Sequence, residues 1–318
     1  MRLADYRALP ARFRAHLLAA AEAHAGTSPD VALSLSGGVD SATLLFALLA
    51  LGRLVHCFTF RLGARDSRDS AAARSMAHAL GVPWTLVEIP RTSEQLRADV
   101  RRVLAITGNA RKVYVQCPQP YLHVAPAIAA AGFDRCLVGT AADNLWGTSR
   151  EVMVAARSES DAEVRSLREQ DTGGVVTTSA HTALVARAVA GVELVDPYRE
   201  HAPLVAFMLD TPYRLLHEPK VKGLAVRAFD EYWSRGRWYR KNEAYQVVSG
   251  IRAWHETLLT DPALADLHVA GAKQVVVVYR RLLARMVAAG EAPAAPAIVD
   301  PEDSNPDGGD DGGSDDGD

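Results

Sequence analysis

The sequence predicts an α/β protein, in which a doubly wound parallel sheet is continued by a mostly helical C-terminal part. Two observations carry this prediction. Short apolar runs alternate with amphipathic helical patterns through roughly the first 140 residues, and from about residue 179 the pattern is mostly helical. Strands that alternate with helices pair in parallel, because each connecting helix returns the chain to the same end of the sheet.

The first part of the chain contains four expected strands, at 31–35, 54–60, 84–89 and 135–138. Helices are expected at 6–25, from the loop after the first strand to residue 51, at 69–80 and at 122–131. Gly81 and Gly132 directly follow two of these helices, as helix-terminating glycines do. Ligands of such sheets bind at the carboxyl ends of the strands, so the loops after the strands are the candidate site.

The later part of the chain has helical patterns at 180–190, 204–210, 222–234, 244–259 and 271–289. We therefore predict a sheet-containing core at 1–155, a mostly helical part at 156–290 and a tail at 291–318. The tail joins an Ala/Pro stretch to an acidic Asp/Gly segment. Because this composition cannot bury apolar surface, the tail is expected to be disordered.

Composition excludes several classes of protein. The 318 residues are 48% hydrophobic and contain no apolar run long enough to span a bilayer, and the N-terminus lacks the pattern of a signal peptide. We therefore expect a cytoplasmic protein without membrane contact. Cys57, Cys117 and Cys136 are widely spaced and form no CxxC pair, which argues against a disulfide framework or a zinc site. All three are expected to be small buried residues.

Charge is distributed unevenly along the chain. The last 18 residues contain eight acidic and no basic side chains, which leaves 35 basic and 30 acidic side chains in residues 1–300. A mildly basic body suits a polyphosphate ligand, but does not by itself indicate nucleic acid.

The loop after the first strand reads Ser-Gly-Gly-Val-Asp-Ser at residues 36–41. Gly37 and Gly38 let the backbone approach a polyphosphate closely, and the N-terminus of the following helix favours anionic oxygens. Asp40 is a poor neighbour for phosphate unless it holds Mg²⁺, which binds carboxylates together with phosphate oxygens. The alternative is a serine-glycine turn that only caps a helix.

A second acidic loop, residues 138–147, follows the fourth strand and contains Asp143. Its strand position places it at the same edge of the sheet as the first loop. On these residues alone, Asp143 is either a second metal carboxylate or the N-cap of a short helix.

The first loop resembles the PP-loop of the ATP pyrophosphatase superfamily, whose fold is of the HUP type. Together, the two loops resemble the synthetase domain of asparagine synthetase, in which the second loop reads SGEGADELFG. The resemblance implies that Asp40 and Asp143 hold Mg²⁺. It also implies catalytic roles for Asp40, Asp143 and Lys222, with Lys220 as a competitor of Lys222. The implied ATP-binding residues are Leu35, Ser36, Gly37, Gly38, Asp40, Ser41, Phe60, Gly139 and Lys222.

The sequence departs from that family in two respects. No glutaminase domain with an N-terminal cysteine precedes the loop, so the amine is expected to be ammonia, an amine of the substrate or a group delivered by a partner protein. Thr140 and Asn144 replace two glutamates of the second loop. A threonine cannot act as a general base. The open candidates for replacement acid–base groups are Tyr121, His123, Glu151, His181 and His201.

The implied function is an ATP- and Mg²⁺-dependent ligase that adenylates a carboxylate and passes it to an amine, forming an amide or a lactam. The carboxylate is expected on a small molecule or a peptide. One alternative is adenylation of a nucleobase in tRNA or DNA, because residues 232–241 interleave aromatic and cationic side chains. Another is a non-catalytic, nucleotide-binding partner subunit.

Overall fold

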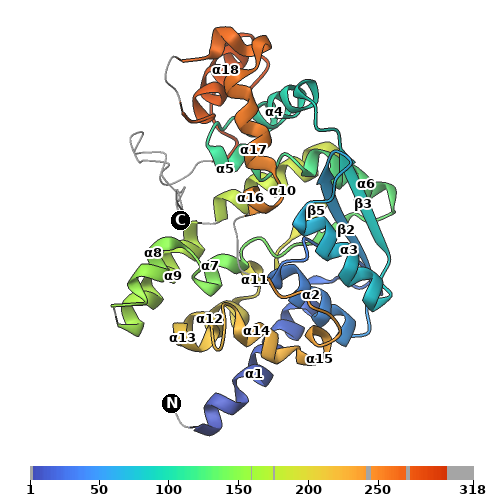
Figure 1. Ribbon diagram of the computed structural model, residues 1–318, viewed down its shortest axis with the longest axis vertical. Helices are drawn as coiled ribbons and strands as arrows, with labels where there is room; N and C mark the ends of the chain where they lie inside the picture. The colour runs from blue at the N-terminus through green and yellow to red at the C-terminus, as the bar shows by residue number, and fades with distance from the viewer. Residues whose placement is uncertain (1–2, 159, 175, 241–244, 270–272, 299–318) are drawn as a thin grey trace.

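The computed structural model describes residues 3–158, 160–174, 176–240, 245–269 and 273–298. Its centre is one sheet of five parallel strands in the order β3-β2-β1-β4-β5. The strands are β1 Asp30–Ser34, β2 Leu54–Leu62, β3 Trp84–Ile89, β4 Arg135–Leu137 and β5 Glu193–Val195. The predicted doubly wound α/β class is confirmed (Figure 1).

Helices cover both faces of the sheet. On one face lie α1 Leu3–His24, α2 Val39–Ala50 and α3 Arg68–Leu80, and on the other α6 Tyr121–Ala130 and α10 Val176–Ala190. Successive side chains of β1 alternate between these layers, since Val31 and Leu33 join the core under α1 and α2 whereas Ala32 joins the core under α6. A strand that is buried on both faces needs a continuous apolar run, which is what its sequence provides.

The strand order reverses next to β1. From β1 the chain moves outward through β2 to β3, and it then returns to place β4 and β5 on the other side. The loops that follow β1 and β4 therefore leave the sheet in opposite directions and leave a crevice between them. This reversal brings residues 36–41 next to residues 138–147.

The remaining elements are mostly short helices between and after the strands. They are α4 Ser93–Thr107, α5 Lys112–Gln116, α7 Ala142–Trp146, α8 Arg150–Ala155, α9 Asp161–Gly174, α11 Pro197–Glu200, α12 Ala202–Asp210, α13 Tyr213–Leu216, α14 Gly223–Ala228, α15 Asp230–Trp233, α16 Tyr245–Val248, α17 Ile251–Glu256, η1 Thr257–Thr260, η2 Pro262–Leu267 and α18 Val276–Ala288.

Several expected elements differ in the structure. The helix expected at 244–259 is divided into α16, α17 and η1, and the one expected at 271–289 is described as α18 from residue 276, with residues 244, 271 and 272 outside the described part of the chain. The helix expected at 222–234 is divided, because Lys222 has a left-handed backbone (φ 57°) and Phe229 is non-helical, leaving α14 and α15 on either side of Phe229. The sheet also continues past the expected boundary at residue 155, since β5 pairs with β4. The helical part is thus not separate from the sheet.

The segment after α18 corrects the expectation of disorder from residue 291. The backbone N–H of Ala297 donates to the carbonyl of Thr107, and Glu291 forms an ion pair with Arg101 at 2.5 Å. Both partners belong to α4, so this Ala/Pro stretch lies against that helix, although most of its residues stay exposed. The acidic residues 299–318 lie outside the described part of the chain.

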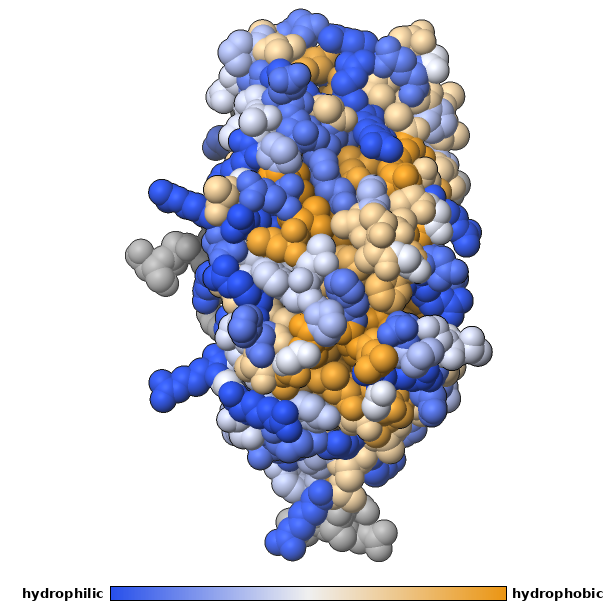
Figure 2. Space-filling view, turned by 90° about the vertical axis from the view of Figure 1, so that its right-hand side faces the viewer, coloured by the Kyte–Doolittle hydropathy of each residue, from blue (hydrophilic) through white to orange (hydrophobic). Residues whose placement is uncertain are grey.

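One edge of the sheet is formed by β3, whose residues 84–87 are half-buried. Figure 2 shows the side of the molecule on which β3 and α6 lie in Figure 1, with hydrophobic residues gathered in a band flanked by polar ones. In the described ranges, no helix combines the length and the apolar character that crossing a bilayer requires.

Candidate active site

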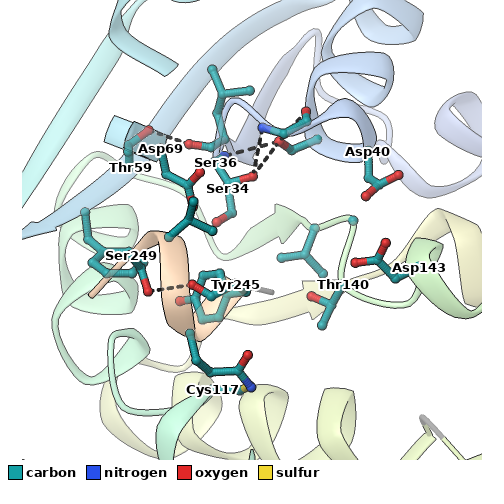
Figure 3. Close-up of a pocket in the computed structure, with 18 of the residues that line it drawn as sticks. Ser34, Ser36, Asp40, Thr59, Asp69, Cys117, Thr140, Asp143, Tyr245 and Ser249 are labelled. Atoms are coloured by element: carbon teal, nitrogen blue, oxygen red, sulfur yellow. Dashed lines mark hydrogen bonds between the residues drawn. The ribbon is translucent and has the colours of Figure 1, made fainter. Parts of the chain in front are cut away.

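A cavity of about 430 Å³ opens at the carboxyl ends of β1, β2 and β4. Its walls come from the two loops, from the first turn of α3, from α6 and α10, and from α16. Figure 3 shows Asp40, Thr140 and Asp143 on one side of this cavity, with Tyr245 and Ser249 on the opposite side. A cavity therefore lies at the predicted position, the carboxyl ends of the strands.

The serine-glycine loop is held by its own hydroxyl groups. The Oγ atom of Ser41 accepts the backbone N–H of Ser36 at 3.2 Å, and the two serine Oγ atoms lie 3.0 Å apart. Gly37 has a φ of +72°, and a Cβ atom there would lie 2.7 Å from the backbone nitrogen of Ala73. Glycine is therefore required at this position both by the backbone conformation and by the packing of the loop on α3.

Directly after this loop, α2 begins without a side-chain cap. Its N-cap is Gly38, and no side chain bonds to the first-turn N–H groups from that position. A helix N-terminus without a cap presents unpaired N–H groups and the positive end of the helix dipole. These groups, together with the two serine hydroxyls, make the loop suited to anionic oxygens.

The two acidic side chains meet at one cation. The Nζ atom of Lys222 lies 2.6 Å from Oδ2 of Asp40 and 2.6 Å from Oδ1 of Asp143. The lysine side chain is 1% exposed, whereas the Asp40 side chain is 15% and the Asp143 side chain 51% exposed. Asp143 lies within the first turn of α7 and is not its N-cap, which is Ala141. These contacts join residues 79 and 182 positions distant from Lys222.

The ion pairs oppose the cost of burial. Burial disfavours the charge on Lys222, but the carboxylates of Asp143 and Asp40 together raise its pKa above the ordinary value. Burial raises the pKa of the Asp40 carboxyl, while Lys222 and the indole of Trp146 act to lower it. One ammonium between two carboxylates leaves a net negative charge at this point, which favours a further cation.

The spacing of the two acidic loops is set by a turn after β5. The hydroxyl of Tyr198 donates to the backbone carbonyl of Asp40 at 3.2 Å. Two residues earlier, Oδ2 of Asp196 accepts the backbone N–H of Ala141 at 2.7 Å. Burial raises the pKa of Asp196 to about 7, against the lowering by the N–H groups that it accepts. A single turn therefore contacts both loops.

His217 holds the backbone of Lys222. Its Nδ1 accepts the backbone N–H of Lys222 at 3.1 Å, so its Nε2 carries the proton that it donates to the carbonyl of Trp146 at 2.9 Å. Burial lowers the pKa of His217 to about 4. The neutral imidazole is thus the form that fits the folded protein.

We expect the His217→Gln variant to lose less stability in acid than the wild type does. The pKa of His217 is lower in the folded than in the unfolded protein, so its contribution is complete above pH 6.5 and is lost as the pH falls towards 4. That loss amounts to about 2 to 3 kcal/mol. Urea unfolding at pH 7 and pH 4 measures it, with the exposed His78→Gln as control. Equal acid sensitivity in all three proteins would contradict the assignment.

Most of the predicted nucleotide-binding residues line the cavity: Leu35, Ser36, Gly38, Asp40, Ser41, Phe60 and Gly139, together with the metal candidate Asp143. Gly37 instead lies against α3. Of the two competing lysines, Lys222 reaches both carboxylates, whereas the Nζ of Lys220 lies 3.6 Å from the ring centroid of Tyr239.

The acid–base candidates mostly lie elsewhere. Only Tyr121 among them lines the cavity, and burial raises its pKa, so it is a poor base. His123 bonds to Asp99 at 2.9 Å, and His181 stacks on Tyr114. Glu151 and His201 also lie outside the cavity wall. Thr140 lines the cavity, so the exchange of a glutamate for a threonine falls within the site.

Sequence reasoning missed several groups of the site. Trp146 donates its indole N–H to Oδ1 of Asp40 at 2.8 Å, and Tyr245, Gln246 and Ser249 form one wall. Cys117, expected to be buried in the core, also lines the cavity, whereas Cys57 and Cys136 are buried. Trp146 belongs to the second loop, at 138–147, and this position was the one available sign that it could be part of the site. The α16 residues carry no motif.

The aromatic residues of the segment 232–241 pack inward, and Lys241 lies outside the described part of the chain. Tyr232 stacks on Phe46 with centroids 5.0 Å apart, and Trp233 contacts the same ring edge-on at 5.1 Å. Trp238 is buried and donates to Ser75. Arg240 forms an ion pair with Asp69 at 2.9 Å. Such packed rings are not a surface on which bases of a nucleic acid stack.

The residues at the carboxylate pair fit Mg²⁺ when a nucleotide supplies further oxygens. Mg²⁺ in nucleotide sites is commonly held by one or two carboxylates plus phosphate oxygens. Among the described residues, no group of three or more His, Cys, Asp or Glu side chains is arranged for a metal. A cation of the protein already lies between the two acids, which shows that the spacing of Asp40 and Asp143 accommodates positive charge.

Fold and site together define an α/β protein of the PP-loop class: a doubly wound parallel sheet with a serine-glycine loop after β1 and an acidic loop after β4. The family model described as asparagine synthase matches residues 12–188, which is more than half of the sequence. The chain belongs to the asparagine synthase family, a group of ATP-utilising PP-loop enzymes.

Curated relatives match a shorter stretch. The chain is 37% identical over 62 residues to a 7-cyano-7-deazaguanine synthase of Alteromonas mediterranea, covering 20% of this chain and 28% of the relative. It is 48% identical over 59 residues to the 7-cyano-7-deazaguanine synthase of Frankia casuarinae, covering 18% of this chain and 25% of the relative. The matched segments thus span about a quarter of the length of these relatives.

Proposed function

We propose that this protein is an ATP-dependent synthetase that adenylates a carboxylate, releases pyrophosphate and transfers the acyl group to an amine, forming an amide or a lactam. The observation that carries the proposal is the meeting of Asp40, Asp143 and Lys222 beside a loop whose N–H groups and hydroxyls suit anionic oxygens. ATP use agrees with the family. The finer statement, a C–N bond-forming ligase, rests on the asparagine synthase match and on the chemistry of the site.

In the proposed reaction, an oxygen of the substrate carboxylate attacks the α-phosphorus and the bond to the β-phosphate oxygen breaks. Bound Mg²⁺ would neutralise charge on the departing pyrophosphate, held by Asp40 and Asp143. The N–H groups at the start of α2 and the ammonium of Lys222 stabilise the same charge. The amine then attacks the acyl-adenylate and displaces AMP. We place this activity in the cytoplasm, with ammonia, a substrate amine or a partner protein as the source of nitrogen.

A second candidate is favoured by the names of the curated relatives, which describe a synthase of a cyano-substituted deazaguanine. In this candidate the adenylated group belongs to a nucleobase or a nucleobase analogue. The inward packing of Tyr232, Trp233 and Trp238 supports a free base more than one within tRNA or DNA. A non-catalytic partner subunit is less well supported, because the two carboxylates and the lysine remain together.

The experiment that tests the proposal follows an oxygen atom. The protein is incubated with ATP, Mg²⁺, ammonia and a panel of carboxylic acids, including nucleobase acids, each labelled with ¹⁸O in the carboxylate. We expect AMP and pyrophosphate as products, with one ¹⁸O in AMP, because the acyl-adenylate leaves its bridging oxygen on AMP. Formation of ADP and phosphate, or AMP without label, would contradict the proposed chemistry. Binding of RNA or DNA that weakens with added salt would favour the polymeric substrate.

A further inference from the structure

One buried hydroxyl group in the cavity has no hydrogen-bond partner among the described residues. Tyr245 is the first residue of α16, and its ring lines the cavity. Its Oη atom is buried and makes no hydrogen bond with any residue that the structure describes. Burying a hydroxyl without a partner is unfavourable, so native proteins rarely do so without a reason. A ligand atom that accepts a hydrogen bond from this hydroxyl would supply the missing partner.

The position of Tyr245 indicates which end of a ligand it meets. Figure 3 shows Tyr245 on the wall opposite Asp40 and Asp143. Its ring is edge-on to the ring of Phe60 on β2, with centroids 6.0 Å apart and planes at 69°. A molecule anchored by its phosphates at the serine-glycine loop and extending across the cavity therefore ends near these two rings.

The chemistry of this end suits a flat, neutral ring. Asp69 and Arg240, which are charged, pair with each other at 2.9 Å. The groups around Tyr245 are the phenol of Tyr121 and the thiol of Cys117, both neutral because burial raises the pKa of each. Burial also raises the pKa of Tyr245 well above its usual value, so its hydroxyl keeps a proton to donate.

The ligand of the proposed function that joins a polyanion to a flat, neutral ring is ATP. We propose that Tyr245 is a specificity-determining residue, whose phenol donates a hydrogen bond to a ring nitrogen of the adenine when ATP is bound. This inference rests on the proposed function, and it assigns recognition of the base to a helix far beyond residues 12–188 of the family match.

The backbone of α16 is fixed independently of the phenol. The hydroxyl of Ser249 donates to the carbonyl of Tyr245 at 2.7 Å, and the side-chain amide of Gln246 donates to the sulfur of Cys117 at 3.2 Å. The Tyr245→Phe substitution therefore removes one hydroxyl and keeps both the helix and the contact with Phe60. Because that hydroxyl makes no bond to the described residues, the variant should have at least wild-type thermal stability.

The test measures equilibrium binding to the full chain by calorimetry. The probes are Mg²⁺-ATP, its 1-deaza, 3-deaza and 7-deaza analogues, and pyrophosphate with Mg²⁺. We expect Tyr245→Phe to bind ATP about 5- to 10-fold more weakly and pyrophosphate unchanged. One deaza analogue should bind the wild type as weakly as ATP binds the variant, and should lose nothing further in the variant. Tyr6→Phe, whose hydroxyl bonds to Glu218 at the surface, is the matched control with unchanged ATP affinity.

Three results would overturn the inference. Equal ATP affinity of the wild type and Tyr245→Phe would remove the base contact while leaving the proposed function intact. Equal weakening of ATP and pyrophosphate binding would show that the substitution disturbs the serine-glycine loop instead. Absence of ATP binding by the wild type itself would refute the proposed function, and this inference with it.

Discussion

The Asp40→Asn variant should lose about 10³-fold in the rate of pyrophosphate release while remaining folded. The introduced amide would keep an oxygen to accept the indole N–H of Trp146, which now lies 2.8 Å from Oδ1 of Asp40, and it has nearly the same volume as the carboxylate. It lacks the charge with which Asp40 would hold Mg²⁺ beside the triphosphate in the proposed reaction. Steady-state pyrophosphate release, measured with the acid found in the labelling experiment, gives the ratio of rates.

A matched substitution separates this effect from a general loss of an acid. Asp134 is exposed and precedes β4 at the opposite end of the sheet from the cavity. We expect Asp134→Asn to retain wild-type activity. A decrease of less than tenfold for Asp40→Asn, with a thermal unfolding midpoint like that of the wild type, would mean that Asp40 does not hold the catalytic metal.

The Lys222→Met variant should lose both stability and activity. The substitution removes the ammonium of Lys222, and the carboxylates of Asp40 and Asp143 are left without the cation that joins them. Removing one partner from a buried ion pair commonly costs about 3–5 kcal/mol, and exposure of Asp143 to solvent places our expectation at about 3 kcal/mol. Activity should fall by about 10²-fold or more, because the proposed reaction uses the Lys222 ammonium to stabilise charge on the departing pyrophosphate. Urea unfolding and pyrophosphate release measure the two effects.

Added Mg²⁺ provides the internal check on this variant. With Lys222 absent, a free metal ion can neutralise the two acids, so Mg²⁺ should raise the unfolding free energy of Lys222→Met more than that of the wild type. Lys220→Met is the control, because Lys220 lies two residues before Lys222 and packs on the ring of Tyr239. If Lys220→Met had the larger effect on activity, the roles of the two lysines would be reversed.

The parts of the fold and site that the sequence predicts are those whose chemistry is local. The run of apolar residues before Ser36, the paired glycines and the helical pattern after Val39 specify a strand, a loop and a helix within about twenty residues. Asp143 could be placed because its loop also follows a strand. The two loops belong together because parallel strands end at the same edge of a sheet.

The remaining parts depend on contacts between distant segments. Tyr198 reaches Asp40 across 158 residues, and nothing in the sequence around Tyr198 marks its hydroxyl as a donor to that loop. The three-residue strand β5 is too short to show an apolar period. Lys222 could be proposed only through the resemblance, since its place between two acids follows from a left-handed turn held by His217.

The turn at Asp196 and Tyr198 has a consequence for how this protein can be divided. The match to the family model ends at residue 188. Asp196 and Tyr198, which contact the two acidic loops, lie eight and ten positions further on. The segment that identifies the family and the residues that hold the two loops together are thus different parts of the polypeptide. A chain truncated after residue 188 would retain Asp40 and Asp143 but lose the contacts of Asp196 and Tyr198 with the two loops.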